Sequence, residues 1–279
     1  CCTALTSITL VNGITSIGLN MFTDCTALTT ITIPSSVTSI GSGAFQGCTA
    51  LTSITIPNGV TIINASIFFG CTSLTSVNLP NSVTSIGNNV FLGCTSLTSI
   101  TIPDSVTSIG SAVFYRCYAL TSATLGKRIV SIGTNLFYQC YSLTSVTIPN
   151  GITSISGQMF YGCSALTSIT IPSSVTYIGT GAFTDCSSLR SVTLPTSFTS
   201  IGSTPFSGCY NIKTINNAPI TVSWHSISVS SQNNSAPFFN GVFSTFDIID
   251  TTIINVFYTS SDITRNILAH TNDDYGANF

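Results

Sequence analysis

Apolar and polar residues alternate along the chain in a unit that recurs at a fixed interval. One copy, residues 48–70, reads CTALTSITIPNGVTIINASIFFG. The cysteines that open successive units are Cys2, Cys25, Cys48, Cys71, Cys94, Cys117, Cys140, Cys163, Cys186 and Cys209. A fixed period of this length is typical of a solenoid, in which each unit packs on its neighbours. Positions in the unit are numbered here from 1, the cysteine, to 23.

The first half of the unit has the pattern of a half-buried strand. Positions 4, 7 and 9 are apolar in nearly every unit, and Ser or Thr separates positions 7 and 9. This alternation predicts a strand with one buried face. Position 10 is Pro in seven units, from Pro34 to Pro195, with Gly126 as an exception. Proline ends the strand because it has no N–H to donate to a ladder.

The second half predicts another short strand and a turn. Position 16 is Ile in each unit from Ile17 to Ile201, and position 13 is also apolar. Gly is frequent at position 17, which predicts a turn with positive φ. Position 21 is Phe in each unit from Phe22 to Phe206. We expect this Phe on a short helical turn, with its ring filling the wide end of the core.

The fold class predicted is a repeat solenoid of about nine to ten units over residues 1–216. Parallel strands of successive units would lie about 4.7–4.9 Å apart, which gives a stack roughly 40–45 Å long. Regularity fades after Ile215. We interpret residues 217–279 as a degenerate repeat with an inserted loop, followed by a capping strand at IINVFY and a capping helix from Ser260 or Ser261. The chain begins within the pattern, so we expect more chain before Cys1 or another molecule over that end.

Composition narrows the classes of function. The chain is 43% hydrophobic, only 5% charged, and has a formal net charge of −2. Charged residues average about 25% in soluble domains, so Ser, Thr and Asn must keep this surface soluble. We expect a secreted or assembled protein rather than a cytosolic enzyme. There is no basic footprint for nucleic acid, and the sequence shows no apolar run long enough for a membrane span.

The pattern L-T-S-I-T-I-P-x-S-V-T-S-I-G-x-x-A-F-x-x-C resembles the BspA-like, or treponemal, class of leucine-rich repeats. The resemblance covers residues 2–215, with Leu, Ile, Pro, Ile, Gly, Phe and Cys at the family's positions. It implies a right-handed solenoid, horseshoe-like or nearly straight, and an ending of a strand and then a helix. It also implies a cell-surface or secreted protein, often linked to adhesion.

The cysteine at position 1 recurs on one face of every unit. Side chains that point the same way are poorly oriented for a bridge, and zinc requires ligands that face one another. We therefore predict buried free thiols that act as small apolar side chains, with no metal and no cofactor. A bridge somewhere is the alternative, and Cys1, which lies outside the series, is its first candidate.

A stripe of larger side chains interrupts the Ser and Thr pattern and is our candidate binding site. At position 22 it comprises Phe69, Leu92, Tyr115, Tyr138 and Tyr161, and nearby residues are Tyr118, Tyr141, Arg116, Lys127 and Arg128. Tyr and Arg are enriched at binding hot spots, and a large exposed apolar patch often marks an interaction site. The alternative is that these rings pack on neighbouring turns as additional core.

Rows of Thr at positions 5 and 8 have two interpretations. They form a neutral β-branched surface, or they form a regular array that binds ice or glycans. Catalysis has little support, because His225 and His270 are the only histidines and no catalytic motif accompanies the nearby Asp residues.

The sequence therefore predicts a non-enzymatic extracellular, cell-surface or particle-surface protein that binds a protein or glycan. The alternative is a structural subunit of a fibre, filament or virion surface. Copies of the chain would then join through the stripe or by end-to-end stacking.

Overall fold

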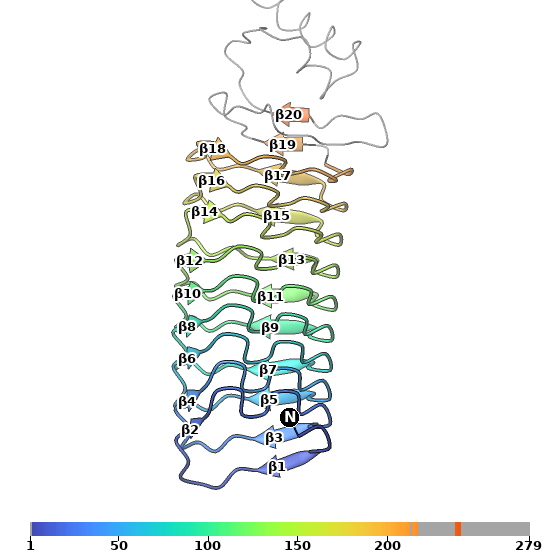
Figure 1. Ribbon diagram of the computed structural model, residues 1–279. Coiled ribbons are helices and arrows are strands. Elements are labelled where there is room, and N and C mark those ends of the chain that lie inside the picture. Colours follow the sequence, from blue (N-terminus) through green and yellow to red (C-terminus); the bar gives the residue numbers. More distant parts are fainter. Residues whose placement is uncertain (1, 213, 217–237, 241–279) are drawn as a thin grey trace, which may run out of the picture.

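The computed structural model describes residues 2–212, 214–216 and 238–240, which form a nearly straight column of stacked rungs (Figure 1). The first strand of each rung is β1 (Ser7–Thr9), β3 (Thr30–Thr32), β5 (Ser53–Thr55), β7 (Ser76–Asn78), β9 (Ser99–Thr101), β11 (Ser122–Thr124), β13 (Ser145–Val146), β15 (Ser168–Thr170), β17 (Ser191–Thr193) or β19 (Thr214–Asn216). The second strand is β2 (Ser16–Ile17), β4 (Ser39–Ile40), β6 (Ile62–Ile63), β8 (Ser85–Ile86), β10 (Ser108–Ile109), β12 (Ser131–Ile132), β14 (Ser154–Ile155), β16 (Tyr177–Ile178) or β18 (Ser200–Ile201).

All strand pairs among the described residues are parallel, and the register follows the repeat. Ile8 pairs with Ile31 and Ile178 pairs with Ile201, so partners occupy the same position of adjacent units. The predicted parallel solenoid with two short strands per unit is thus confirmed. A further strand, β20 (Phe238–Asn240), pairs with β19 and continues the parallel sheet. The capping strand and helix predicted further on lie outside the described residues.

The core runs the length of the column without interruption. It consists of the apolar side chains at positions 1, 4, 7, 9, 13, 16, 20 and 21, and the described residues contain no buried polar or charged side chain. The position-21 rings stack from Phe22 to Phe206, with adjacent centroids 5.2–5.8 Å apart. Each ring therefore buries its faces against the rings of the neighbouring rungs, as the repeat pattern predicted.

The segment that carries the Phe is a turn, and the predicted helical turn is wrong. Its alternate N–H groups point to the next rung: Phe45 N–H donates to Ile67 O at 3.0 Å and Gly47 N–H to Phe69 O at 2.8 Å. Because these N–H groups donate to the next rung, they cannot form the i→i−4 hydrogen bonds that an α-helix needs. The residues at positions 19 and 23 of this turn have positive φ, such as 63° at Gly43 and 70° at Gly47, whereas residues of an α-helix have negative φ.

The glycines at position 17 also differ from the prediction, because none of them has a positive φ. They are required by close approach between rungs. A Cβ on Gly179 would lie 2.5 Å from the backbone nitrogen of Gly157 in the preceding rung. The closeness lets Gly179 N–H donate to Ile155 O at 2.7 Å. Position 17 thus fixes the spacing of the second strands.

Two rungs carry a larger residue at position 17, and there the second-strand ladder breaks. Asn64 follows β6, which is not paired with β4, and Ser156 follows β14, which is not paired with β12. At Asn64 the side chain takes over the carbonyl of position 16 that a glycine N–H reaches elsewhere, whereas the Ser156 side chain bonds to the carbonyl of position 17. Asn64 Nδ2 donates to Ile40 O at 2.7 Å, and Ser156 Oγ donates to Gly133 O at 2.8 Å. The stack continues through these breaks because the Phe turn and first strands still pack.

Candidate functional site

Three tyrosines at position 22 form a column along one edge of the solenoid. Tyr115 and Tyr138 stack with centroids 4.4 Å apart, and Tyr138 and Tyr161 with centroids 4.6 Å apart. All three are half-buried, as are Phe69 and Leu92 at the same position of the two preceding rungs. Each lies in the turn that leads from a second strand to the next first strand. The rings pack on one another and still expose surface, so their geometry is compatible with both interpretations of the stripe.

A second column runs beside the first, at position 2. Tyr118 and Tyr141 stack with centroids 5.2 Å apart and are 37% and 44% exposed. Arg116 lies over the Tyr115 ring, with Cζ 5.3 Å from the centroid, and its Nε donates to Gln139 Oε1 at 2.9 Å. We call Tyr115, Tyr118, Tyr138, Tyr141 and Tyr161 together the tyrosine edge.

Lys127 and Arg128 are not part of this edge. They are exposed in the turn that joins β11 to β12, whereas Tyr115 and Arg116 lie in the turn that joins β10 to β11. The backbone N–H of Lys127 donates to Asp104 Oδ1 at 2.9 Å in the preceding rung. The sequence placed these cations with the stripe because they belong to nearby units, but they occupy a different position within the unit.

The column raises the pKa of two of its phenols, Tyr138 and Tyr161. Burial is the largest cause at Tyr138, followed by the charges that Tyr115 and Tyr161 would carry, and Arg116 opposes the shift. At Tyr161 burial again raises the pKa most, followed by the charge of Asp185 and a side-chain hydrogen bond with it. The phenols of Tyr138 and Tyr161 are therefore neutral at physiological pH and present hydroxyl groups that donate and accept.

Gln139, Asp185 and Tyr210 adjoin the tyrosine edge and were missed from the sequence. With Tyr141 and Tyr161 they line a hollow of about 310 Å³. Gln139 and Asp185 occupy position 23, and Tyr210 occupies position 2. The signal was present, because position 2 had already singled out Tyr118 and Tyr141. Tyr210 was passed over because two rungs with Ser at position 2 separate it from them.

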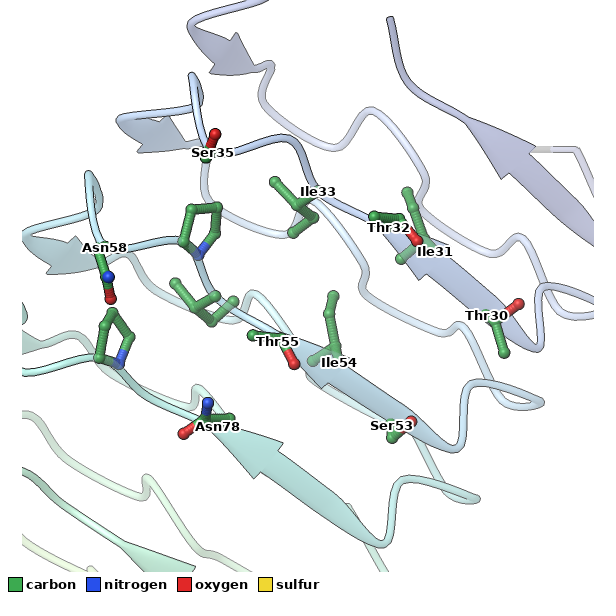
Figure 2. Close-up of a pocket in the computed structure, with 13 residues that line it drawn as sticks. Thr30, Ile31, Thr32, Ile33, Ser35, Ser53, Ile54, Thr55, Asn58 and Asn78 are labelled. Atoms are coloured by element: carbon green, nitrogen blue, oxygen red, sulfur yellow. The ribbon is translucent and has the colours of Figure 1, made fainter. Parts of the chain in front are cut away.

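A larger hollow of about 690 Å³ lies on the face of β3, β5 and β7 (Figure 2). Its lining combines Thr, Ser and Asn side chains with apolar residues of these strands and of the segments that follow them. The polar residues are Thr30, Thr32, Ser35, Ser53, Thr55, Asn58 and Asn78. No charged or aromatic side chain lines it. This hollow offers hydroxyl, amide and methyl groups but no aromatic ring or charge, so we base the candidate site on the tyrosine edge.

The Thr rows differ in what their hydroxyls do. At position 5, Thr75 Oγ1 donates to Thr52 O at 3.0 Å and Thr121 Oγ1 to Thr98 O at 3.0 Å. These hydroxyls join each rung to the preceding one, so the row is part of the scaffold. Thr residues of position 8, such as Thr32 and Thr55, are exposed on the strand face. The ice-binding interpretation stays a prediction.

The cysteines of the described rungs are free, and those from Cys25 to Cys209 are buried. From Cys48 onward each Sγ donates to a Phe carbonyl of the adjacent rung, as Cys48 does to Phe22 O at 3.1 Å. Burial raises the pKa of the Cys48 thiol to about 12. The prediction of buried free thiols is confirmed for these rungs, whereas Cys1 lies outside the described residues. Among the described side chains no group of three Cys, His, Asp or Glu could hold a metal ion.

His225 and His270, considered above for catalysis, lie outside the described residues. In the described ranges no helix is long and apolar enough to cross a membrane. No curated protein matches the chain.

The repeat region matches a known family. The model of the BspA type leucine rich repeat region matches residues 1–121 and 107–236. A leucine-rich repeat protein from Bacteroides ovatus is 31% identical with a TM-score of 0.55, covering 77% of this chain and 67% of its own. The T. pallidum leucine rich repeat protein is 30% identical with a TM-score of 0.54, covering 57% of this chain and 77% of its own.

A leucine rich cell surface protein from Faecalibacterium prausnitzii is 27% identical with a TM-score of 0.44, covering 81% of this chain and 82% of its own. The family model and the first two structures confirm the resemblance seen in the repeat pattern. Such repeat proteins are generally non-catalytic. The chain belongs to the BspA-type leucine-rich-repeat family.

Proposed function

We propose that this chain is a non-catalytic recognition protein of an extracellular, cell or particle surface, and that it binds a protein or glycan through the tyrosine edge. The observation that carries the proposal is the pair of tyrosine columns themselves. Tyrosine offers a large rigid contact area at a low entropic cost. Here stacking on the neighbouring rungs restrains the rings further, which reduces the side-chain entropy that is lost when a ligand binds.

The core does not need these rings. Thr23, Gln46, Thr184 and Ser207 occupy position 22 in other rungs, and the Phe stack passes through those rungs unchanged. The tyrosines therefore add exposed area to a scaffold that is already complete. The low charge supports an extracellular setting over a cytosolic one. It also means that ligand contact would rest on aromatic and hydroxyl groups and would depend little on ionic strength.

The test is a double variant, Tyr115→Ser with Tyr138→Ser. Binding of the purified chain to immobilised extracellular-matrix proteins and glycans is measured by surface plasmon resonance. We expect at least about a tenfold loss of affinity for the ligand that wild type binds. Tyr177→Ser is the matched control, because Tyr177 is 37% exposed but lies in β16, away from the edge.

Light scattering over a concentration series separates ligand binding from self-assembly. A mass near that of one chain, 29.2 kDa, agrees with a monomeric binding protein. A large assembly that the double variant dissolves would instead support the structural role. If the double variant keeps both its self-association and its ligand binding, the edge has neither role.

A further inference from the structure

Aromatic rings border the hollow at the C-terminal end of the tyrosine edge. Tyr141 and Tyr210 are 44% and 43% exposed. Both occupy position 2, three rungs apart, which is roughly 14 Å at the spacing of parallel strands. Tyr161 lines the hollow from position 22 of the same unit as Tyr141. The exposed rings thus stand at the two ends of a groove along the solenoid axis.

Small residues open the space between the rings. Ser164 and Ser187 take position 2 in the two rungs between Tyr141 and Tyr210, and Gly162 and Gly208 take position 23. Both glycines are buried, so they form the floor. The hollow of about 310 Å³ is at the lower end of the sizes found for small-ligand sites, about 300–1,000 Å³.

Polar groups of complementary kinds line the same space. The carboxylate of Asp185 is exposed and accepts hydrogen bonds only. Burial, followed by the charge of Asp185 and its hydrogen bond with Tyr161, raises the pKa of that phenol and keeps it protonated. Gln139 accepts from Arg116 Nε through Oε1, which leaves its NH2 group as a donor. A fitting ligand must therefore offer both donors and acceptors beside a face that packs on a tyrosine ring.

These groups exclude several ligand classes. An anion would face Asp185, the one charged side chain of the lining. An acyl chain would desolvate the carboxylate, the amide and two serines without replacing their hydrogen bonds. A proline-rich peptide suits tyrosine-lined grooves, but proline has no N–H for the carboxylate. A sugar ring has hydroxyls that donate and accept, and C–H faces that pack on aromatic rings.

We infer that this hollow binds a neutral saccharide, with Tyr141 and Tyr210 packing on sugar rings and Asp185 accepting from sugar hydroxyls. The inference rests on the proposed function and names the ligand class for one end of the same edge. Recognition is expected to depend little on salt, because screening acts on pairs of charges and the ligand carries none.

The experiment uses the full chain on an array of neutral hexose and N-acetylhexosamine oligosaccharides, with affinities then measured by calorimetry. Wild type is expected to bind at least one of these saturably. Tyr210→Ser and Asp185→Asn should each weaken it by about tenfold or more, which is about 1.4 kcal/mol, because the first removes a ring that packs on the sugar and the second removes a charged acceptor. Raising the salt concentration should leave the affinity nearly unchanged.

Asp24→Asn is the matched control. Asp24 occupies position 23 with φ 56°, close to the 60° of Asp185, but Thr26 and Thr49 stand where the hollow has Ser187 and Tyr210. Asp24→Asn should leave saccharide binding unchanged.

Absence of binding to every neutral oligosaccharide overturns the inference, as does binding that survives both substitutions at the hollow. An affinity for the saccharide that collapses as the salt concentration rises would show that binding depends on charged groups, and it also overturns the inference. The proposed function is judged separately. A protein ligand lost in the Tyr115 and Tyr138 double variant would uphold it even when the array is negative.

Discussion

At the scale of single residues, the glycines at position 17 set the spacing between rungs, because they have no side chain. The sequence shows that position 17 is usually glycine but does not show the reason. A glycine that avoids a steric clash and a glycine that adopts a positive φ look the same in a sequence. The structure separates the two roles. Gly179 permits close approach, whereas the left-handed residues are at positions 19 and 23 and include Ala112 and Arg116. Only the neighbouring rung reveals the difference, and a single unit of sequence does not contain it.

Replacing Gly179 by Ala is expected to destabilise the solenoid. The added Cβ would lie 2.5 Å from Gly157 N and 2.8 Å from Gly157 Cα, both backbone atoms that cannot move independently of the rung. Overpacking of this kind costs about 1–3 kcal/mol. Urea unfolding followed by circular dichroism measures the loss.

Gly157→Ala is the control for this prediction. Gly157 begins the Phe turn of the preceding rung, its φ is not positive, and the nearest atom to an added Cβ is Thr180 O at 3.5 Å. We expect no more than a small change in the urea midpoint. Equal destabilisation by both substitutions would contradict the view that close approach at position 17 sets the rung spacing.

At the scale of the element, the alternation of side chains predicted the strands, while the turn required knowledge of where its N–H groups go. The apolar residues at positions 7, 9, 13 and 16 identify both strands, because burial on one face leaves a direct mark on the pattern. The turn around Phe45 has an apolar ring on a short loop, as a helical turn would. Its hydrogen bonds run to Ile67 in the next rung, a contact that no local pattern encodes.

The stacked Phe rings are the element most sensitive to truncation. Phe114 is fully buried and stacks on Phe91 at 5.5 Å and on Phe137 at 5.4 Å. Phe114→Ala should lower the free energy of unfolding by about 3–5 kcal/mol, through lost burial and the cavity left behind. Chemical denaturation measures the loss. Tyr115→Ser, at the adjacent but half-buried position, should cost clearly less, and equal losses would show that the Phe column is not the main source of stability.

At the scale of the whole molecule, the candidate site exists only because rungs stack in register. Tyr141 and Tyr210 come from units far apart in the sequence but belong to one groove lined also by Asp185. The sequence predicted the tyrosine columns, since consecutive units display them at one position. It did not predict the groove, because that arises from small residues at Gly162 and Ser164 between larger ones. A glycine or serine in the sequence does not indicate a groove. The groove can be recognised only when the larger side chains of the neighbouring rungs have been positioned in space.

The buried thiols make the stability of the whole column depend on alkaline pH. Burial is the largest cause that raises the pKa of the ladder thiols Cys48, Cys71, Cys94, Cys117, Cys140, Cys163 and Cys186. For Cys48 the pKa rises from 9.0 to about 12. A raised pKa in the folded state means that the unfolded chain releases protons first as pH rises. The contribution of the protonated thiols to the free energy of unfolding is thus complete below about pH 9 and is lost as pH rises toward 12.

We therefore expect the free energy of unfolding, measured in urea with a reductant present, to fall steadily above about pH 9. Each thiol that ionises only on unfolding contributes about 1.4 kcal/mol per pH unit to the slope. A variant with Cys94→Ala and Cys117→Ala starts less stable, because two buried side chains are truncated, but its slope should be shallower by about 2.8 kcal/mol per pH unit. The slope is the informative quantity, since lost packing lowers stability at every pH alike. Parallel slopes in the two proteins would show that the thiols titrate in the folded column as they do in the unfolded chain.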